Sequence, residues 1–173
     1  MAGVPATLTA QEALALFDSL PAVPLPAAQG VWRGEGLHTG HPLDGLLEAC
    51  HWHGKRIDDP EHVQPLVFDK LGGGTLCVEP VGVRLGIAAV LRFPVLKSRP
   101  AGRLVQALLP LLKTQDSQAR LRMLETRGVT SATILYDTVP IHDALRQEDA
   151  DTLLGMMDLK GLAQPLFFRL RRE

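Results

Sequence analysis

Histidines are the first residues of this sequence that could do chemistry. His41 lies between Gly40 and Pro42, three residues before Asp44. A nearby carboxylate can orient an imidazole, and an oriented imidazole can serve as a general acid or base. The competing interpretation, which we favour, is a turn in which His41 bonds to the backbone. His41 and Asp44 are nevertheless kept as the candidate acid–base pair of an enzyme.

A second pair, His51 and His53, flanks Trp52. Residues two apart on a strand point to the same face, and two imidazoles on one face can bind a metal. We expect Trp52 to face the core, which turns both histidines toward solvent, so no metal is assigned to them. His142 and Asp143 are adjacent on a predicted strand, where they point to opposite faces and form no dyad.

Ionisable side chains also occur in or beside apolar segments: Asp44, Tyr136, Asp137, Asp143, Arg146, Asp158 and Lys160. Because desolvation of an ion is costly, charges that enter a core are paired. Some of this group could therefore be paired inside the molecule and line a cavity, where polar groups anchor one end of a ligand. We predict this role for Tyr136, Asp143 and Arg146. Asp158 and Lys160 could equally lie in a turn.

Length and composition restrict the class of protein. The 173 residues are enough for one domain with a real core and too few for two independent ones. A net charge of −1 gives no electrostatic reason to expect nucleic acid or an anionic membrane as a partner. Cys50 and Cys77 form no CxxC motif and no disulfide framework, so we expect free thiols.

The sequence also bears on location. Residues 1–10 lack the basic start and the apolar run of a signal peptide. No apolar run reaches the roughly 20 residues that a membrane span requires. A cytoplasmic protein is therefore expected.

The first element expected to position the candidate residues is an N-terminal helix. Thr9 is a typical N-cap, and apolar residues at helical spacing follow up to Leu20, before Pro21 ends the helix. Pro21, Pro24 and Pro26 then predict an extended connector.

Short apolar segments follow at roughly ten-residue spacing, which is typical of an antiparallel meander that closes on itself. The predicted strands are Leu46–Trp52, Val63–Phe68, Thr75–Val78, Val83–Phe93, Ala119–Glu125, Val129–Tyr136, Pro140–Gln147, Thr152–Met157 and Pro165–Arg171. The stretch Arg99–Thr114 has leucines at helical spacing but contains Pro110, and it predicts a short helix or a lid.

Trp32 lies between glycines in Gly30-Val31-Trp32-Arg33-Gly34, a segment that alternates like a strand. A tryptophan in such a setting can plug one end of a small β-barrel, and the glycines let the backbone bend around it. The chain is therefore predicted to surround an enclosed interior.

Longer motifs carry a family resemblance. The first half contains Gly30-x-Trp32-x-Gly34, Thr39-Gly40-His41-Pro42-x-Asp44, Trp52-x-Gly54-Lys55 and Pro65-Leu66, and it resembles the bacterial GXWXG domain. The second half contains Ala119-Arg120-Leu121-Arg122, Pro140-Ile141-x-Asp143, Leu154-Gly155-x-Met157-Asp158-x-Lys160-Gly161 and Phe167-Phe168-x-Leu170-x-Arg172. It resembles the domain of unknown function that usually follows. The sequence departs from the first pattern at His53, where an aromatic residue is common.

The Gly-x-Trp-x-Gly start is also similar to the first strand of lipocalins, fatty-acid-binding proteins and nitrobindin-type barrels. This similarity implies a mainly β fold: a single antiparallel calycin-like β-barrel over residues 1–173. It would comprise an N-terminal helix and connector (1–28), a GXWXG half (29–97) and a C-terminal half (98–173).

We expect the barrel to bind a small hydrophobic or amphipathic, lipid-like ligand. The predicted contacts are Trp32, Trp52, Phe68, Phe93, Tyr136, Asp143, Arg146, Met156 and Phe168. Plain core packing is the alternative for most of the aromatic residues.

Three other functions stay open, and the cofactor is left unassigned. The barrel resemblance suggests haem bound through an axial histidine, as in nitrobindin-type proteins. An enzyme could use His41 and Asp44 in the cavity. A third alternative is an interaction role through an exposed barrel edge or a homodimer interface. The sequence contains no Gly-x-Ser-x-Gly elbow and no glycine loop in the setting of a phosphate site, so no named reaction is favoured.

Overall fold

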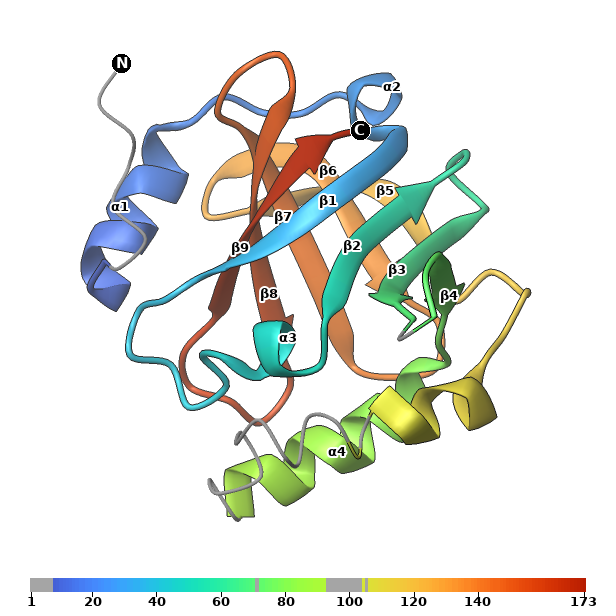
Figure 1. The fold of residues 1–173 in the computed structure, drawn as a ribbon. Helices are drawn as coiled ribbons and strands as arrows, with labels where there is room; N and C mark the ends of the chain where they lie inside the picture. Colours follow the sequence, from blue (N-terminus) through green and yellow to red (C-terminus); the bar gives the residue numbers. More distant parts are fainter. Residues whose placement is uncertain (1–7, 71, 93–103, 105) are drawn as a thin grey trace.

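The computed structural model describes residues 8–70, 72–92, 104 and 106–173. Across these ranges nine strands form one antiparallel sheet in the order β2-β1-β9-β8-β7-β6-β5-β3-β4, and a further pairing of β2 with β3 closes it into a ring (Figure 1). The strands are β1 Gly30–Leu37, β2 Trp52–Ile57, β3 Val63–Asp69, β4 Thr75–Cys77, β5 Ala119–Thr126, β6 Val129–Tyr136, β7 Ile141–Gln147, β8 Thr152–Leu159 and β9 Leu166–Arg172. The predicted mainly β, closed antiparallel fold is confirmed.

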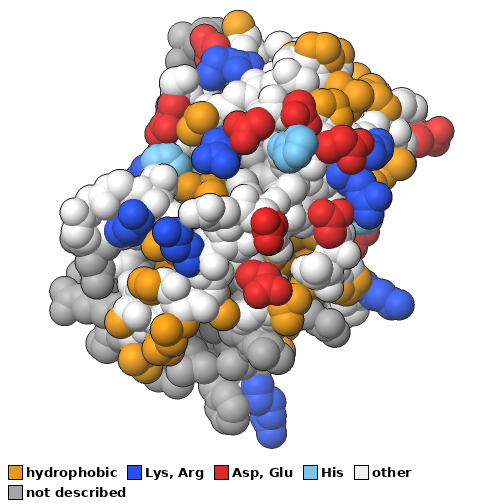
Figure 2. Space-filling view, turned by 90° about the vertical axis from the view of Figure 1, so that its right-hand side faces the viewer, with side chains coloured by type: hydrophobic (Ala, Val, Ile, Leu, Met, Phe, Trp, Pro, Cys, Tyr) orange, Lys and Arg blue, Asp and Glu red, His pale blue; other side chains and the backbone are white. Residues whose placement is uncertain are grey.

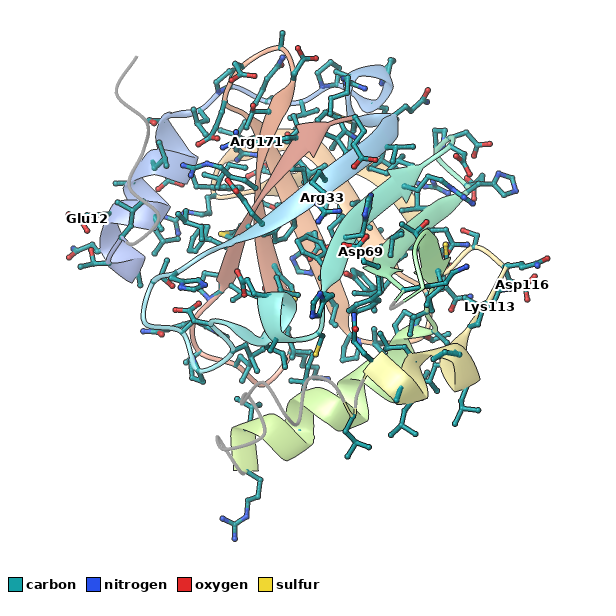
Figure 3. All side chains as sticks on the ribbon, in the orientation of Figure 1. Glu12, Arg33, Asp69, Lys113, Asp116 and Arg171 are labelled. Carbon is teal, nitrogen blue, oxygen red and sulfur yellow. The ribbon has the colours of Figure 1, made fainter. Side chains whose placement is uncertain are left out.

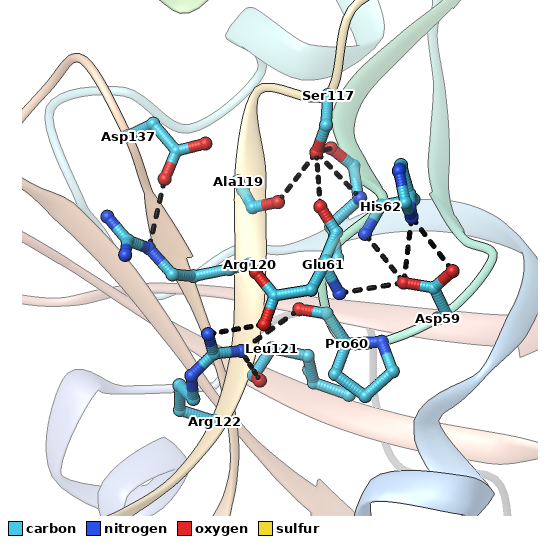
Figure 4. Close-up of polar contacts among 11 residues, drawn as sticks. Asp59, Pro60, Glu61, His62, Ser117, Ala119, Arg120, Leu121, Arg122 and Asp137 are labelled. Carbon is cyan, nitrogen blue, oxygen red and sulfur yellow. Dashed lines mark hydrogen bonds and ion pairs between the residues drawn. The ribbon is translucent and has the colours of Figure 1, made fainter.

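Both halves of the sequence contribute to the same ring, because β1 pairs with β2 on one side and with β9 on the other. The weakest pairing in the ring is between β3 and β5, which meet at Val63 and Ala119. Side chains reinforce this seam (Figure 4). Arg122 Nη2 donates to Glu61 Oε1 over 2.6 Å, and Ser117 Oγ donates to the Glu61 carbonyl over 2.9 Å. The turn between β2 and β3 is thereby held against β5.

The N-terminal helix α1 (Ala10–Ser19) covers part of the outer face of the ring (Figure 1). It begins with a capping box: Thr9 Oγ1 accepts from the Glu12 N–H over 3.2 Å, and Glu12 Oε2 accepts from the Thr9 N–H over 2.7 Å. Its buried face contributes to an outer apolar cluster made of Ala13, Phe17, Leu37, Ala144, Leu154, Met156 and Phe167. The strands beneath α1 are therefore buried on both faces.

One predicted strand begins as a helix. The segment Leu46–Trp52 forms α3 (Leu46–Ala49), and β2 starts only at Trp52. Gly45 has φ 80° and His51 has φ 55°, so a residue with a left-handed backbone conformation lies near each end of this single helical turn. His51 is therefore not on a strand beside His53, and the two imidazoles do not form the predicted same-face pair.

The predicted strand Val83–Phe93 is also wrong, because this region forms helix α4 (Pro80–Arg92). A continuous apolar run fits a buried strand and a buried helix equally well, and Pro80 suits the first position of a helix. Part of the predicted helix or lid at Arg99–Thr114 is a 3-10 helix, η2 (Leu109–Leu112). Residues 99–103 and 105 lie outside the described residues. Both α4 and η2 lie at one end of the barrel (Figure 1).

Trp32 lies in the interior and is fully buried. Its Nε1 donates to the carbonyl of Ala28, at the end of the short helix α2 (Leu25–Ala28), over 2.9 Å. The Arg172 guanidinium lies 4.2 Å from the centroid of its ring. On the neighbouring strand, Gly54 has φ 149°, and a Cβ there would overlap the Trp32 carbonyl. The glycine next to Lys55 thus allows β1 and β2 to approach.

One side of the barrel carries charged and hydrophobic side chains together. On the side that faces right in Figure 1, charged side chains of both signs cross the middle of the view, and hydrophobic side chains gather at the upper right and the lower left (Figure 2). None of the helices in the described ranges is long and apolar enough to cross a membrane.

Candidate functional site

The most unusual group in the interior is the ammonium of Lys55. A regular strand would turn Trp52 and Lys55 to opposite faces, because they are three residues apart. The pairing of β2 with β3 is irregular on both sides of Gly54. A bulge of this kind re-aims the side chains that follow it. As a result, Trp52 and Lys55 are both buried, at 6% and 2% exposure.

Lys55 forms a buried ion pair with Asp143 of β7. Its Nζ lies 2.7 Å from Asp143 Oδ2, and Asp143 is 0% exposed. Nζ also donates to the Tyr136 hydroxyl and to the Pro65 carbonyl, each over 3.2 Å. The Tyr136 hydroxyl in turn donates to Asp143 Oδ2 over 3.1 Å. Three strands, β2, β6 and β7, thus bring one cation, one anion and one phenol together.

Aromatic rings surround this Lys55–Asp143–Tyr136 cluster. The Lys55 Nζ lies 4.8 Å from the ring centroid of Phe168, 5.5 Å from that of Trp52 and 5.6 Å from that of Tyr136. These distances are within the range of cation–π attraction. Trp52 and Phe168 also contact each other edge to face, with centroids 5.7 Å apart. The charge pair is therefore enclosed by π faces, which stabilise a cation that water cannot reach.

Two glycines make room for these rings. A Cβ at Gly34 would overlap the Trp52 ring, and a Cβ at Gly155 would overlap the Phe168 ring. Gly34 is the second glycine of the Gly-x-Trp-x-Gly motif. This motif therefore contributes Trp32 at one end of the interior and a bare backbone surface for Trp52 beside the cluster.

Burial sets the protonation of the phenol. Desolvation, followed by the nearby charge of Asp143, raises the pKa of Tyr136 well above its usual value of 10. The phenol therefore stays protonated and remains a donor to the carboxylate. Within the part of the chain that the structure describes, two buried atoms beside the cluster have no hydrogen-bond partner: Asp143 Oδ1 and Trp52 Nε1. Buried polar atoms of this kind require an explanation.

A surface hollow of about 210 Å³ reaches the same tryptophan from outside. It lies where β1 diverges from β2, and its lining consists of Arg33, Gly34, Glu35, Gly36, Leu47, Glu48, His51, Trp52 and Asp69. Arg33 and Asp69 point toward each other (Figure 3), with Arg33 Nη2 3.2 Å from Asp69 Oδ2. His53 Nδ1 lies 2.7 Å from Asp69 Oδ1, which places this imidazole on the outer surface. Trp52 thus lies between the hollow and Lys55.

The structure brings together most of the predicted contact residues. Trp32, Trp52, Phe68 and Phe168 belong to the interior apolar cluster, and Tyr136 packs against it. Asp143 joins them through Lys55. Phe93 lies outside the described residues. Lys55 itself was not among the predicted contacts, although it occurs in the Trp52-x-Gly54-Lys55 motif.

Arg146 and Met156 lie on the other face of the sheet, beneath α1. Met156 belongs to the outer cluster, and the Arg146 guanidinium lies 4.6 Å from the ring centroid of Phe17. Arg146 Nη2 donates to the Thr126 carbonyl over 2.9 Å, and burial lowers the pKa of the guanidinium. The expectation that Arg146 shares a cavity with Tyr136 and Asp143 is wrong. Asp143 and Arg146 are three apart on a regular strand and therefore point to opposite faces.

His41 and Asp44 hold a loop together. Asp44 Oδ2 accepts from the backbone N–H groups of Thr39, Gly40 and His41 over 2.8 to 2.9 Å. The His41 Nδ1 lies 3.1 Å from the Leu43 N–H, and its Nε2 lies 3.1 Å from a backbone carbonyl in the β8–β9 connection. These contacts match the backbone-bonded turn that we favoured.

The histidines do not fit the haem alternative. All six lie in the described ranges; both ring nitrogens of His41 contact backbone groups, and His51 is exposed and lines the surface hollow. His53 faces the outer surface, and His38, His62 and His142 lie 3.2, 2.8 and 3.7 Å from Glu48, Asp59 and Asp158 respectively. No imidazole is therefore placed to bind haem iron from within the barrel.

Comparison with known proteins gives a family-model match in each half of the chain. Residues 15–73 match the GXWXG protein family, and residues 117–172 match a domain of unknown function, DUF4334. The chain therefore contains a GXWXG region followed by a DUF4334 region. The ring unites these two regions, since GXWXG strand β1 pairs with DUF4334 strand β9.

One solved structure resembles this chain over most of its length. It is described as the crystal structure of a protein from Thermomonospora curvata. The two chains are 29% identical, with a TM-score of 0.71, over 97% of this chain and 90% of the other. A search of curated proteins gave no match.

Proposed function

We propose that this protein binds a small apolar or amphipathic molecule inside the barrel, with the polar end at the Lys55–Asp143–Tyr136 cluster. Trp52 and Phe168 would contact the apolar part closest to that end, and Trp32 and Phe68 would contact it farther along. The observation that supports this proposal is a fully buried ion pair within an aromatic enclosure, beside two buried polar atoms that lack partners.

Stability alone does not account for such a cluster. Replacing a buried ion pair with hydrophobic residues of similar volume is often neutral or stabilising, because removing two charges from water costs more than their attraction returns. Ligand sites, in contrast, typically combine an apolar lining with a few convergent polar groups. A small barrel of eight strands is also wide enough for one small ligand when side chains do not fill it.

The two tryptophans provide a test of where in the barrel the ligand binds. Trp52 borders the cluster, whereas Trp32 bonds to Ala28 at the α2 end. The chain contains two tryptophans in all, so Trp32→Phe and Trp52→Phe each leave a single reporter. We expect an apolar ligand to change the fluorescence of Trp32→Phe, which retains Trp52 beside the cluster, more strongly than that of Trp52→Phe, which retains Trp32 farther from the polar end.

Native mass spectrometry of the purified protein provides an independent measurement. A co-purified small molecule that is released on unfolding would support the proposal. The proposal would be rejected if the protein carried no such molecule and a panel of amphiphiles produced no fluorescence change in either variant. A change reported by Trp32 alone would place the ligand away from the cluster and would also contradict it.

A further inference from the structure

We infer that the bound molecule presents a neutral hydrogen-bonding group, such as an alcohol hydroxyl, to the Lys55–Asp143–Tyr136 cluster, and that carboxylates are excluded. This inference rests on the proposed function and adds the chemical class of the polar end. It follows from counting the donors, acceptors and charges that the cluster has already used.

The cationic group has no proton left to offer. The Lys55 ammonium carries three N–H groups, and its three contacts are Asp143 Oδ2, the Pro65 carbonyl and the Tyr136 hydroxyl. The phenol proton is also used, because Tyr136 donates it to Asp143 Oδ2. An incoming carboxylate or phosphate would therefore find no free donor on the lysine or the tyrosine.

The two atoms that remain open are of opposite kinds. Asp143 Oδ1 is a carboxylate oxygen, which only accepts, and Trp52 Nε1 is an indole N–H, which only donates. Both belong to residues packed around the Lys55 ammonium. A hydroxyl or a primary amide can both donate and accept, so a neutral group can serve either atom without adding charge.

The net charge of the cluster also favours a neutral ligand group. The Lys55 and Asp143 charges cancel at a separation of 2.7 Å. A ligand carboxylate would place a second anion beside Asp143, and like charges that share a buried site disfavour each other's ionised form. A neutral group adds no charge to the site.

The test compares two probes with the same alkyl chain, 1-octanol and octanoate, at pH 8. Octanoate is fully ionised there, since carboxyl groups titrate near pH 4. Binding is measured by fluorescence of the Trp32→Phe variant, in which Trp52 is the reporter. We expect octanol to bind about tenfold more tightly or better, because sites with fixed polar partners discriminate strongly between groups that match and groups that do not.

Asp143→Asn provides the matched control, since it keeps the side-chain shape and removes the negative charge. The Lys55 ammonium then lacks a counter-ion, and octanoate can supply one. We expect the preference to shift toward octanoate by about tenfold relative to octanol. If this variant does not fold, the comparison of the two probes on the Trp32→Phe protein still decides the question.

The outcomes separate the two proposals. Equal or tighter binding of octanoate would overturn the inference about the polar end while leaving interior binding in place. An unchanged preference in Asp143→Asn would also overturn it, because the carboxylate would then play no part in selection. Binding of neither probe, together with a clean native mass spectrum, would mean that the open atoms serve only buried water and would overturn both proposals.

Discussion

Removal of the Lys55 ammonium should be among the most destabilising single changes in this protein. In Lys55→Met the chain keeps a side chain of similar length but leaves the Asp143 carboxylate buried, and among the described residues only the Tyr136 hydroxyl still donates to Oδ2. At the observed N–O distance of 2.7 Å, the Coulomb attraction at an effective dielectric constant of about 20 is about 6 kcal/mol. Desolvation offsets part of this energy, and loss of one partner of a buried pair costs about 3–5 kcal/mol.

The assay is urea unfolding followed by tryptophan fluorescence, with the free energy of unfolding compared among four proteins: wild type, Lys55→Met, Asp143→Leu and the double variant. Because the double variant leaves no unpaired charge, it should be more stable than either single variant, with a coupling energy of about 3 kcal/mol. Arg120→Met is the surface control. Arg120 lies 3.1 Å from Asp137 and its side chain is half exposed, so its loss should cost less than about 1 kcal/mol.

Two results would refute this reasoning. One is a cost for Lys55→Met as small as that of Arg120→Met, which would mean that water reaches the ammonium. The other is a double variant no more stable than the single ones, which would mean that Lys55 and Asp143 contribute independently.

Three further predictions concern neighbouring groups. Gly34→Ala should cost about 1–3 kcal/mol and alter the near-UV circular dichroism, because the new Cβ overlaps the Trp52 ring and forces it to move. Tyr136 is the sole tyrosine and has a raised pKa, so tyrosinate absorbance should stay absent as the pH rises past 10 and should appear only when the protein unfolds. The free energy of unfolding should fall above pH 10, because the tyrosine of the unfolded chain ionises there first. Burial raises the pKa of the Cys50 thiol to about 11. In the native protein at pH 8, a thiol reagent should therefore modify the less buried Cys77 first and Cys50 only after unfolding. Equal rates of modification would contradict the burial of Cys50.

The sequence predicted much of the second half of the fold from short-range pattern alone. Val129–Tyr136 was expected as a strand and is one, because β-branched residues alternate there between turn residues. The first half was less predictable. The apolar run after Pro80 carries no periodicity that separates a helix from a strand, and its conformation depends on its packing at the end of the barrel.

The candidate site, like the fold, was predicted from the sequence only in part. Residue type and neighbourhood pointed to Asp143, which is buried, and to Tyr136, which is half-buried beside it. Strict alternation would also have separated Asp143 from Arg146, since an odd spacing on a regular strand changes the face. No local pattern indicated Lys55, because alternation turns it away from Trp52, and only the irregular pairing around Gly54 turns it inward.

The amino-acid sequence by itself thus determined that this is a mainly β protein with a GXWXG region, and with tryptophans and ionisable groups in its apolar segments. Periodicity and turn chemistry are local properties, and they can be read along the chain. Only the tertiary structure decided which of those groups meet. Lys55 and Asp143 are 88 positions apart, and their pairing depends on ring closure and on one bulge. Both are long-range features that no stretch of sequence encodes alone.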